Sequence, residues 1–370
     1  MRIGFDAKRF FFNNTGLGNY SRDLIRMLEL HYPEHTYIKY TPKIPKLPFV
    51  TNDFSENIKG PTKKRDTLFP GVWRQKWIVE DLVADNIDIF HGLSGEIPIG
   101  LKKKHIRSVV SIHDLIFLRF PEWYNPVDRF VYNKKFKYAC NHADKIIAIS
   151  QQTKNDIIHF YNIPPEKIEV IYQGCHPAFK TIKTADEKER VRKKYNLPDS
   201  FILNVGSIEP RKNAFQIVKA IENLDIPLVI IGKETKYSQE IKQYIRRKNL
   251  HNRVFILQGF TMEELSTVYA MAEIFVYPSK YEGFGIPIIE ALYSGTPVIT
   301  TNSGVFSEAG GPFSRYVNPN NPEELSQAIS TILSNNDLRH EMTANGLYFA
   351  QRFNDDNIAS QLIRCYKSFV

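Results

Sequence analysis

Short runs of β-branched and aromatic residues alternate with amphipathic segments along the whole chain of 370 residues, and this alternation limits the possible folds more than any other feature. Strand-like runs separated by helix-length segments are typical of parallel sheets in which a helix follows each strand. The runs lie at residues 2–5, 36–40, 87–90, 108–112, 145–149 and 169–172, and again at 201–205, 227–231, 254–257, 274–277 and 298–301. Two such series predict an α/β protein with two doubly wound, Rossmann-like parallel sheets.

The two series meet within residues 174–200, which contain a turn, a charged helical segment and a second turn. We therefore predict an N-terminal domain at residues 1–178 and a C-terminal domain at residues 179–352. Helical patterns lie at residues 21–30, 215–222, 262–271 and 286–293. Residues 41–71 carry five prolines and few periodic apolar positions, so we expect a long irregular loop there.

The composition excludes several classes of protein. A hydrophobic fraction of 42% and a charged fraction of 24% are ordinary for a globular protein. The apolar runs are far shorter than the ~18 residues of a membrane-spanning helix, and the N-terminal apolar stretch is too short for a secretory signal. Three widely spaced cysteines (Cys140, Cys175 and Cys365) predict neither a disulfide framework nor a metal cluster, so we expect a cytoplasmic protein.

The chain is basic, with 49 Lys and Arg against 40 Asp and Glu and a net charge of +9. Such an excess attracts nucleic acid, anionic lipid surfaces or phosphorylated small molecules, and by itself it does not choose among them. The basic residues form short, separate runs, which are usually solvated surface. Because the chain has no zinc-ligand spacing and no aromatic RNA-binding strand motif, we do not expect a nucleic-acid partner.

In open parallel sheets ligands bind beyond the carboxyl ends of the strands, and several informative residues of the first half lie there. Gly16 and Gly18 precede a helical segment, where glycines allow the backbone to approach an anion closely. They can equally serve a tight turn, and the third glycine of a dinucleotide-binding fingerprint is missing. His113 follows the run at 108–112, where it either faces the ligand or is satisfied by local hydrogen bonds.

In the second half, Gly206 opens a turn after the run at 201–205, and the adjacent cations Arg211 and Lys212 precede a helical segment. A guanidinium can bind phosphate oxygens with two hydrogen bonds, and an ammonium group adds a point charge. Cations at a helix N-terminus oppose the helix dipole, and a bound anion would offset that cost. The alternative is an incidental exposed pair.

Two glutamates eight positions apart follow the run at 274–277. Glu282 lies in the loop Glu282-Gly283-Phe284-Gly285, and Glu290 lies in the helical segment that follows. Carboxylates accept hydrogen bonds from vicinal hydroxyls such as those of ribose or a hexose, and the loop amides can bind a phosphate or sugar oxygen. For Glu290 alone, complementing the helix dipole is the alternative role.

These segments resemble glycosyltransferase family 4. The likeness lies in Gly-Ser…Arg-Lys-Asn at 206–213, Pro-Ser…Glu-Gly-Phe-Gly-x-Pro…Glu at 278–290, Gly-Thr-Pro-Val-Ile at 295–299 and Gly-x-Gly-x-Tyr at 16–20. Residues 143–150 and 171–174 extend it over nearly the whole chain. The resemblance implies the GT-B fold, with two Rossmann-like domains facing a deep cleft and a C-terminal helix at residues 353–370 that returns to the acceptor-binding N-terminal domain. It also implies a retaining hexosyltransferase that uses a nucleotide-sugar and no metal or other cofactor.

By the same resemblance, Glu282 would hold hydroxyls of the donor sugar, Glu290 the ribose, Arg211 and Lys212 the diphosphate, and His113 the donor sugar near the reacting centre. His113, Glu282, Arg211 and Lys212 are therefore the candidate catalytic residues. The donor would also contact Gly16, Gly18, Gly206, Gly259, Phe260, Gly283, Phe284 and Gly285. The chain has no Asp-x-Asp motif, which agrees with the metal-free expectation. An aspartate common in relatives is missing near retained Glu308, so no role is assigned there.

His-Asp-Leu at 113–115 and Gly-Phe-Gly-Ile-Pro at 283–287 resemble mannosyltransferase variants, so we expect GDP-mannose as donor, with UDP-sugars as the alternative. The expected acceptor is a bacterial surface glycan, such as a lipopolysaccharide chain on a lipid carrier at the inner face of the cell membrane. Two alternatives from other classes stay open: a nucleotide-sugar epimerase of the same fold, and a non-catalytic basic binding protein.

One segment bears on membrane association. Trp73, Trp77 and Ile78 lie near Arg74 and Lys76, and aromatic residues beside cations suit a membrane interface. The alternative is a helix that packs its aromatic residues into the core and leaves its charges in water.

Overall fold

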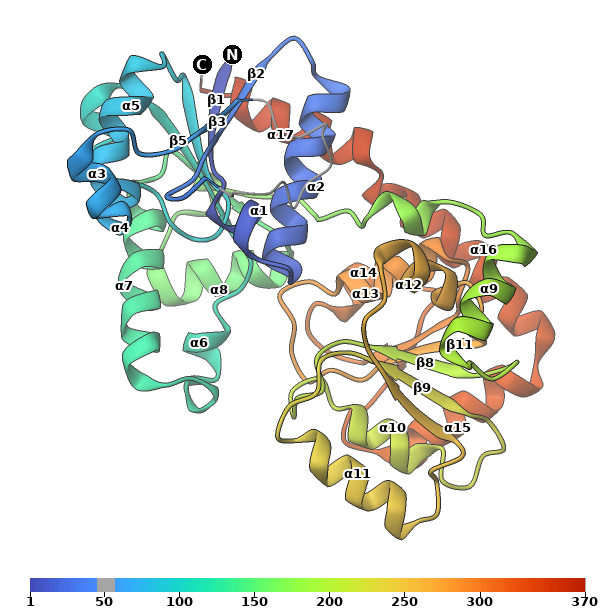
Figure 1. Cartoon of the computed structure of the whole chain (residues 1–370). Helices are drawn as coiled ribbons and strands as arrows, with labels where there is room; N and C mark the ends of the chain where they lie inside the picture. Colours follow the sequence, from blue (N-terminus) through green and yellow to red (C-terminus); the bar gives the residue numbers. More distant parts are fainter. Residues whose placement is uncertain (45–56, 370) are drawn as a thin grey trace. The chain divides into compact units, whose positions relative to one another are not determined.

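The computed structural model describes residues 1–44 and 57–369 and divides into two α/β units (Figure 1). Unit 1 contains residues 1–174 together with residues 354–370, and unit 2 contains Cys175–Phe353. In the residues that the structure describes, each unit is built on one parallel sheet, with seven strands in unit 1 and six in unit 2. The predicted fold class, two Rossmann-like doubly wound sheets, is confirmed.

The sheet of unit 1 has the strand order β3-β2-β1-β4-β5-β6-β7. Its strands are β1 (Arg2–Asp6), β2 (Thr36–Tyr40), β3 (Ile58–Lys59), β4 (Ile89–Gly92), β5 (Arg107–Ile112), β6 (Lys145–Ala148) and β7 (Ile168–Val170). The order reverses between β1 and β4. In a sheet of this kind, the loops that follow the two strands at the reversal diverge and leave a crevice for a ligand.

The helices of unit 1 are α1 (Lys8–Phe12), α2 (Gly16–His31), α3 (Lys64–Leu68), α4 (Pro70–Val72), a π-helical turn (Trp73–Trp77), α5 (Ile78–Ala84), α6 (Ile116–Arg119), α7 (Pro126–His142), α8 (Gln151–Tyr161) and α17 (Asp355–Lys367). Side chains of Asn125 and Ser150 cap α7 and α8 at their N-termini. Helix α17 packs against α2. Its buried Tyr366 reaches the core, where the hydroxyl lies 2.7 Å from Nδ1 of His91.

The sheet of unit 2 has the order β10-β9-β8-β11-β12-β13 and reverses between β8 and β11. Its strands are β8 (Ile202–Val205), β9 (Leu228–Ile231), β10 (Val254–Leu257), β11 (Ile274–Tyr277), β12 (Val298–Thr301) and β13 (Arg315–Val317). Ile202, Ile230 and Val276 belong to one buried core cluster. Strands of a parallel sheet are apolar on both sides because helices cover both faces.

The helices of unit 2 are α9 (Ala185–Tyr195), α10 (Ala214–Ala220), α11 (Ser238–Arg247), α12 (Met262–Tyr269), α13 (Ile286–Tyr293), α14 (Phe306–Gly310), α15 (Pro322–Ser334) and α16 (Asn336–Ala350). Figure 1 shows α10, α11 and α15 on one face of the sheet and α9, α12 and α13 on the other. Capping boxes, in which Thr184 pairs with Glu187 and Thr261 with Glu264, define the starts of α9 and α12.

Most predicted elements agree with the structure, and the differences have physical reasons. Strands β3 and β13 were missed because they are edge strands of two and three residues without an apolar run. The irregular loop expected at residues 41–71 lies partly at 45–56, outside the described residues. For residues 57–71 the expectation is wrong, because β3, α3 and the start of α4 occur there.

The membrane-interface interpretation of residues 72–83 is wrong for the aromatic residues that suggested it. Trp73 and Ile78 are each 1% exposed and pack in a core cluster of unit 1. Trp77 is half-buried beneath the guanidinium of Arg65, which lies 4.3 Å from the ring centroid. The core-packing alternative is therefore correct for Trp73 and Ile78. Its expectation of solvated charges is wrong for Arg74, whose side chain is 11% exposed and pairs with Asp6 and Glu96. Across residues 1–44 and 57–369, no helix combines the length and the apolar character that a bilayer span requires.

Candidate functional site

In unit 2, the loops that follow β8 and β11 are joined at the reversal of the sheet. The backbone N–H of Lys280 donates to the carbonyl of Arg211 at 2.9 Å, and the Asn213 side-chain amide donates to the carbonyl of Pro278 at 3.1 Å. Because β8 and β11 are neighbours at the point where the strand order reverses, these loops border the crevice in which doubly wound sheets bind ligands.

The centre of this region is the carboxylate of Glu282. Its Oε1 atom lies 2.6 Å from Lys212 Nζ, 2.9 Å from Arg211 Nη1, 2.9 Å from the Tyr277 hydroxyl and 2.6 Å from Ser279 Oγ. The structure thus brings together three of the predicted site residues. We call Arg211, Lys212 and Glu282 the ion cluster.

A second carboxylate, that of Glu209, balances the charge of the ion cluster, which the sequence did not predict. Arg211 also donates from Nη2 to Glu209 at 2.8 Å, so two cations face two carboxylates. Carboxylates of the chain itself therefore offset the unfavourable interaction of the two cations with the helix dipole. Glu209 and Glu282 neutralise the pair before any ligand binds.

The ionisation of the cluster follows from burial and mutual attraction. Burial by itself would raise the pKa of Glu282, but the neighbouring Lys212 and Arg211 outweigh it and lower that pKa to about 2. Burial lowers the pKa of Lys212 below its ordinary value, against the attraction of Glu282. Burial by itself would lower the pKa of Arg211, but the attraction of Glu282 outweighs burial and holds that pKa above its ordinary value. Glu282 is ionised at neutral pH.

The two cations keep hydrogen-bond donors for a ligand. A guanidinium has five N–H groups and an ammonium group has three. Within the described part of the chain, Arg211 uses three, to Tyr281, Glu209 and Glu282, and Lys212 uses two, to Tyr277 and Glu282. Two N–H groups of Arg211 and one of Lys212 are left over.

Glu290 lies on α13 and is more buried than a residue at the edge of a crevice, with 7% of its surface exposed. Its Oε2 accepts a hydrogen bond of 3.1 Å from the Tyr269 hydroxyl. After burial, Glu282 and then Glu290 contribute to raising the pKa of Tyr277. Glu282 and Glu290 therefore both raise the pKa of Tyr277. Glu282 accepts a hydrogen bond from Tyr277, whereas Glu290 accepts one from Tyr269.

The glycines and aromatic residues predicted beside the donor have several structural roles. Gly206 has φ of +148° and lies along the Lys212 side chain, and Gly285 has φ of +121° at the N-terminus of α13. The Phe284 ring is buried and packs edge-on against Phe353, with centroids 5.7 Å apart. Gly283, between Glu282 and Phe284, is half-buried. The side chain of Phe284 thus belongs to the core, so a ligand could contact only the backbone of Phe284.

The turn after β10 carries Gly259 and Phe260. Gly259 is exposed with φ of +85°, and the Phe260 ring stacks on Tyr195 of α9 with centroids 3.7 Å apart. The Tyr195 hydroxyl also donates to the carbonyl of Gly259 at 3.2 Å. This stack fixes the turn that carries Gly259 and Phe260, two of the residues expected to contact the donor.

Several residues of the site were not predicted. Tyr277, Ser279 and Glu209 complete the hydrogen bonds of the ion cluster. Gly232 follows β9 just as Gly206 follows β8, and a Cβ atom at Gly232 would lie 1.8 Å from the Gly206 carbonyl oxygen. The position of Gly206 and Gly232 directly after neighbouring strands could have predicted this close approach of the two loops.

In unit 1, the predicted glycines differ from each other. A Cβ atom on Gly18 would lie 1.7 Å from the carbonyl oxygen of Asn13, whereas one on Gly16 would meet open space. The N–H of Gly18 also donates to the Asn13 side chain at 3.0 Å. The tight-turn interpretation therefore accounts for Gly18.

His113 follows β5 and is half-buried. Its Nε2 lies 3.0 Å from the carbonyl oxygen of Leu93, which can only accept, so Nε2 carries the proton. The Gln173 amide lies 3.5 Å from Nδ1, and the Tyr20 ring packs edge-on at 4.5 Å between centroids. Burial is the main cause that lowers the pKa of His113 to about 4, so the imidazole is neutral at neutral pH.

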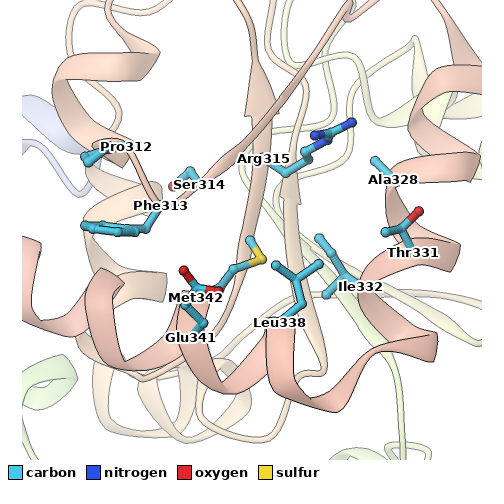
Figure 2. A pocket seen from close by; sticks show the side chains of 10 residues that line it. All are labelled: Pro312, Phe313, Ser314, Arg315, Ala328, Thr331, Ile332, Leu338, Glu341 and Met342. Atoms are coloured by element: carbon cyan, nitrogen blue, oxygen red, sulfur yellow. The ribbon is translucent and has the colours of Figure 1, made fainter.

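A separate hollow of about 260 Å³ in unit 2 contains none of the predicted site residues. Figure 2 shows Ile332, Leu338 and Met342 pointing toward its centre from α15 and α16, beside Phe313 and Arg315. In the described residues, no three His, Cys, Asp or Glu side chains are grouped as metal ligands.

Comparison with known families decides the class. Residues 14–179 match the family model described as Glycosyltransferase Family 4, and residues 186–347 match the model described as Glycosyl transferases group 1. The two matches together cover most of the chain. The chain is a glycosyltransferase of the GT-B fold. The family resemblance of the sequence motifs is confirmed.

Relatives of this glycosyltransferase include bacterial mannosyltransferases. It is 28% identical to the O-antigen chain mannosyltransferase B of Escherichia coli, over 99% of this chain and all of that protein. It is also 28% identical to the O-antigen chain mannosyltransferase RfbU of Salmonella typhimurium, over 60% of each chain.

Solved structures share the fold of this glycosyltransferase. The crystal structure of Anabaena HepE in complex with UDP and glucose has a TM-score of 0.79 and 19% identity, covering 100% of this chain and 99% of that one. A glycosyltransferase from Rickettsia africae has a TM-score of 0.77 and 19% identity, covering 99% and 98%.

Proposed function

We propose that this glycosyltransferase transfers mannose from GDP-mannose to a growing surface glycan, with retention of anomeric configuration and without a metal ion. The observation that carries the proposal is the ion cluster, whose two cations keep three N–H donors at the reversal of the unit 2 sheet. The choice of mannose rests on the E. coli and Salmonella relatives, which are named O-antigen chain mannosyltransferases.

In this proposal the cations of the cluster stabilise the leaving group. When the bond between the anomeric carbon and the diphosphate oxygen breaks, the electron pair stays on the diphosphate and negative charge accumulates there. Donors already held in place stabilise that charge without reorganising during the reaction. Glu282 holds Arg211 and Lys212 in position and accepts hydrogen bonds from hydroxyls of the donor sugar. Glu290 accepts hydrogen bonds from the ribose hydroxyls.

Retention requires that the acceptor oxygen attack the face from which the diphosphate leaves. The new bond joins the acceptor oxygen to the anomeric carbon, and the departing diphosphate oxygen takes the proton of the acceptor hydroxyl. No protein nucleophile is needed in this sequence of events. By the family resemblance His113 would contact the donor sugar, and it would do so as a neutral imidazole whose protonated Nε2 donates to the Leu93 carbonyl.

The proposed acceptor is a lipid-linked bacterial glycan at the cytoplasmic face of the cell membrane. UDP-sugars are the second candidate donors, because the HepE structure that shares this fold contains UDP and glucose.

A thermal-shift screen against GDP-mannose and matched UDP- and ADP-sugars tests the donor. A ligand present at 100 times its dissociation constant adds ~2.7 kcal/mol of stability, which is an easily measured shift. Stabilisation by GDP-mannose, with transfer in the presence of EDTA and an α-linked product by NMR, is the expected result. Stabilisation by a UDP-sugar alone would favour the second candidate. Conversion of the nucleotide-sugar without any acceptor would indicate an epimerase.

A further inference from the structure

Four buried polar side chains of unit 1 hydrogen-bond to one another in a row that ends beside His113. The Tyr20 hydroxyl lies 2.7 Å from Ser111 Oγ, and the same Oγ lies 2.8 Å from Nε2 of His91. On the opposite side of that ring, Nδ1 of His91 lies 2.7 Å from the Tyr366 hydroxyl. The four residues come from α2, β5, β4 and α17, and we call them the buried network.

The buried network satisfies its own polar groups. His91, Ser111 and Tyr366 are completely buried, and Tyr20 is 7% exposed. In residues 1–44 and 57–369, these side chains have no hydrogen-bond partner outside the network. A buried polar group is costly unless it is paired, so apolar side chains would fill this part of the core without that requirement. What the paired groups add is a fixed geometry, because a satisfied network holds each side chain in one orientation.

The network reaches His113 through the ring of Tyr20. This ring packs edge-on against the imidazole, with centroids 4.5 Å apart and 88° between the planes. The imidazole also donates from Nε2 to the Leu93 carbonyl at 3.0 Å, but one hydrogen bond does not fix the plane of the ring. Within the described residues, Nδ1 has only a long contact of 3.5 Å with the Gln173 amide. The direction of the Nδ1 lone pair therefore depends on the orientation of Tyr20.

We infer that the buried network positions His113, with Tyr20 and Ser111 as positioning residues that direct Nδ1 toward the donor sugar. Helix α17 holds the far end of the network through Tyr366. The consequence for transfer rests on the proposed function, in which His113 contacts that sugar. The positioning of the imidazole is testable without any substrate.

The buried network is neutral and can form all three of its hydrogen bonds at once. Burial and, to a smaller extent, the nearby His113 lower the pKa of His91 to about 3. At neutral pH the imidazole of His91 therefore has one nitrogen that donates and one that accepts, and each hydroxyl of the network can do both. Removing one hydroxyl leaves a buried neighbour without its partner, so the remaining side chains reorient. A change at Tyr366 should therefore reach the Tyr20 ring and, through it, His113.

Nitrogen NMR spectra of the histidine side chains, recorded without substrate, test the positioning directly. The signals of His113 are identified by their absence from His113→Asn. We compare the wild-type protein with Tyr20→Phe and Tyr366→Phe, and Tyr37→Phe is the matched control. Tyr37 is a buried tyrosine on β2 whose hydroxyl donates to the Tyr32 carbonyl at 2.9 Å, so its variant also loses one tyrosine hydrogen bond.

Phenylalanine keeps the ring of each tyrosine, so a change in the His113 signals reports a change in geometry. We expect the wild-type protein to show one set of His113 signals with Nε2 protonated, and both network variants to shift or broaden that set. The control should leave the His113 signals unchanged, although its melting temperature falls by a similar amount. Identical His113 signals in the four proteins would overturn the inference. If Tyr20→Phe does not fold, Ser111→Ala removes the same hydrogen bond and takes its place in the comparison.

Transfer kinetics measure the consequence for the reaction. Tyr20→Phe should lower kcat about tenfold and leave the KM for the donor near the wild-type value, because a misdirected Nδ1 affects the reacting geometry more than binding. Tyr37→Phe should keep the wild-type kcat. Changed His113 signals together with a wild-type kcat in Tyr20→Phe would overturn the role of the network in transfer. Changed signals in a protein that binds no nucleotide-sugar would refute the proposed function and leave the positioning of His113 standing.

Discussion

Replacing Lys212 by methionine removes one charge from the ion cluster and changes little else. Methionine keeps an unbranched chain of similar length, so the packing of the residue 212 side chain along Gly206 is retained. This packing is close, because a Cβ atom added to Gly206 would lie 3.7 Å from the Lys212 methylenes. The ammonium group donates to Glu282 and to Tyr277, each at 2.6 Å, and its third N–H is assigned to the diphosphate. Glu282 keeps Arg211, Tyr277 and Ser279 as partners.

The magnitude follows from the role of a preorganised donor. Losing one such donor to developing negative charge costs ~3 kcal/mol, which is roughly a hundredfold in rate. Lys212→Met should therefore lower kcat about a hundredfold, with a smaller change in the KM for the donor. The loss of the two hydrogen bonds to Glu282 and Tyr277 should also reduce the free energy of unfolding by ~1–3 kcal/mol. Arg211→Ala should slow transfer by a similar factor.

The assay measures release of the nucleoside diphosphate at saturating donor and acceptor. Lys236→Met is the matched control, because Lys236 is exposed in the loop that follows β9. Circular dichroism shows whether the variant is folded. A folded Lys212→Met enzyme whose kcat is within threefold of the wild-type value would refute the assignment of Lys212 to the leaving group.

Three further predictions concern unit 1. Burial lowers the pKa of His91 to about 3 and that of His113 to about 4. Below pH ~6.5 these histidines are therefore protonated in the unfolded chain but remain neutral in the folded chain. The free energy of unfolding should fall as the pH drops below ~6.5, by ~2 kcal/mol per histidine at pH 5. Urea unfolding followed by tryptophan fluorescence should show this, and a midpoint that does not change between pH 7 and 5 would contradict it. Gly18→Ala should destabilise the protein by ~1–3 kcal/mol because its Cβ would overlap the Asn13 carbonyl, whereas Gly16→Ala should be nearly neutral; equal melting temperatures would argue against the turn geometry. Tyr366→Phe removes the partner of His91 Nδ1 and should cost ~1–3 kcal/mol in the same urea assay, a loss that an unchanged midpoint would rule out.

Much of the fold was predictable because each strand of a buried parallel sheet is a local apolar run. β10, β11 and β12 begin and end at the predicted residues. The edge strands β3 and β13 have too few residues to form a run, and their pairing depends on the neighbouring strand. The first turn of α2 was missed because its glycines and polar residues carry no apolar periodicity.

The ion cluster was predictable only in part. The residue types and their position after two strands pointed to Arg211, Lys212 and Glu282, but their mutual pairing depends on the adjacency of β8 and β11, which the sequence does not state. The burial of Phe284 and Trp73 also depends on packing partners distant in the chain. Local pattern cannot separate a buried aromatic residue from an exposed one when both lie beside charges or glycines.

The central claim is that Arg211 and Lys212 hold the diphosphate of the donor. Titration calorimetry with GDP and with guanosine isolates this contribution, because the two ligands differ only in the diphosphate. The wild-type protein should bind GDP at least about a hundredfold more tightly than guanosine, and the Arg211→Ala/Lys212→Met double variant should lose most of that difference while binding guanosine as before. If the double variant keeps the full preference for GDP, the diphosphate is held elsewhere and the claim is wrong.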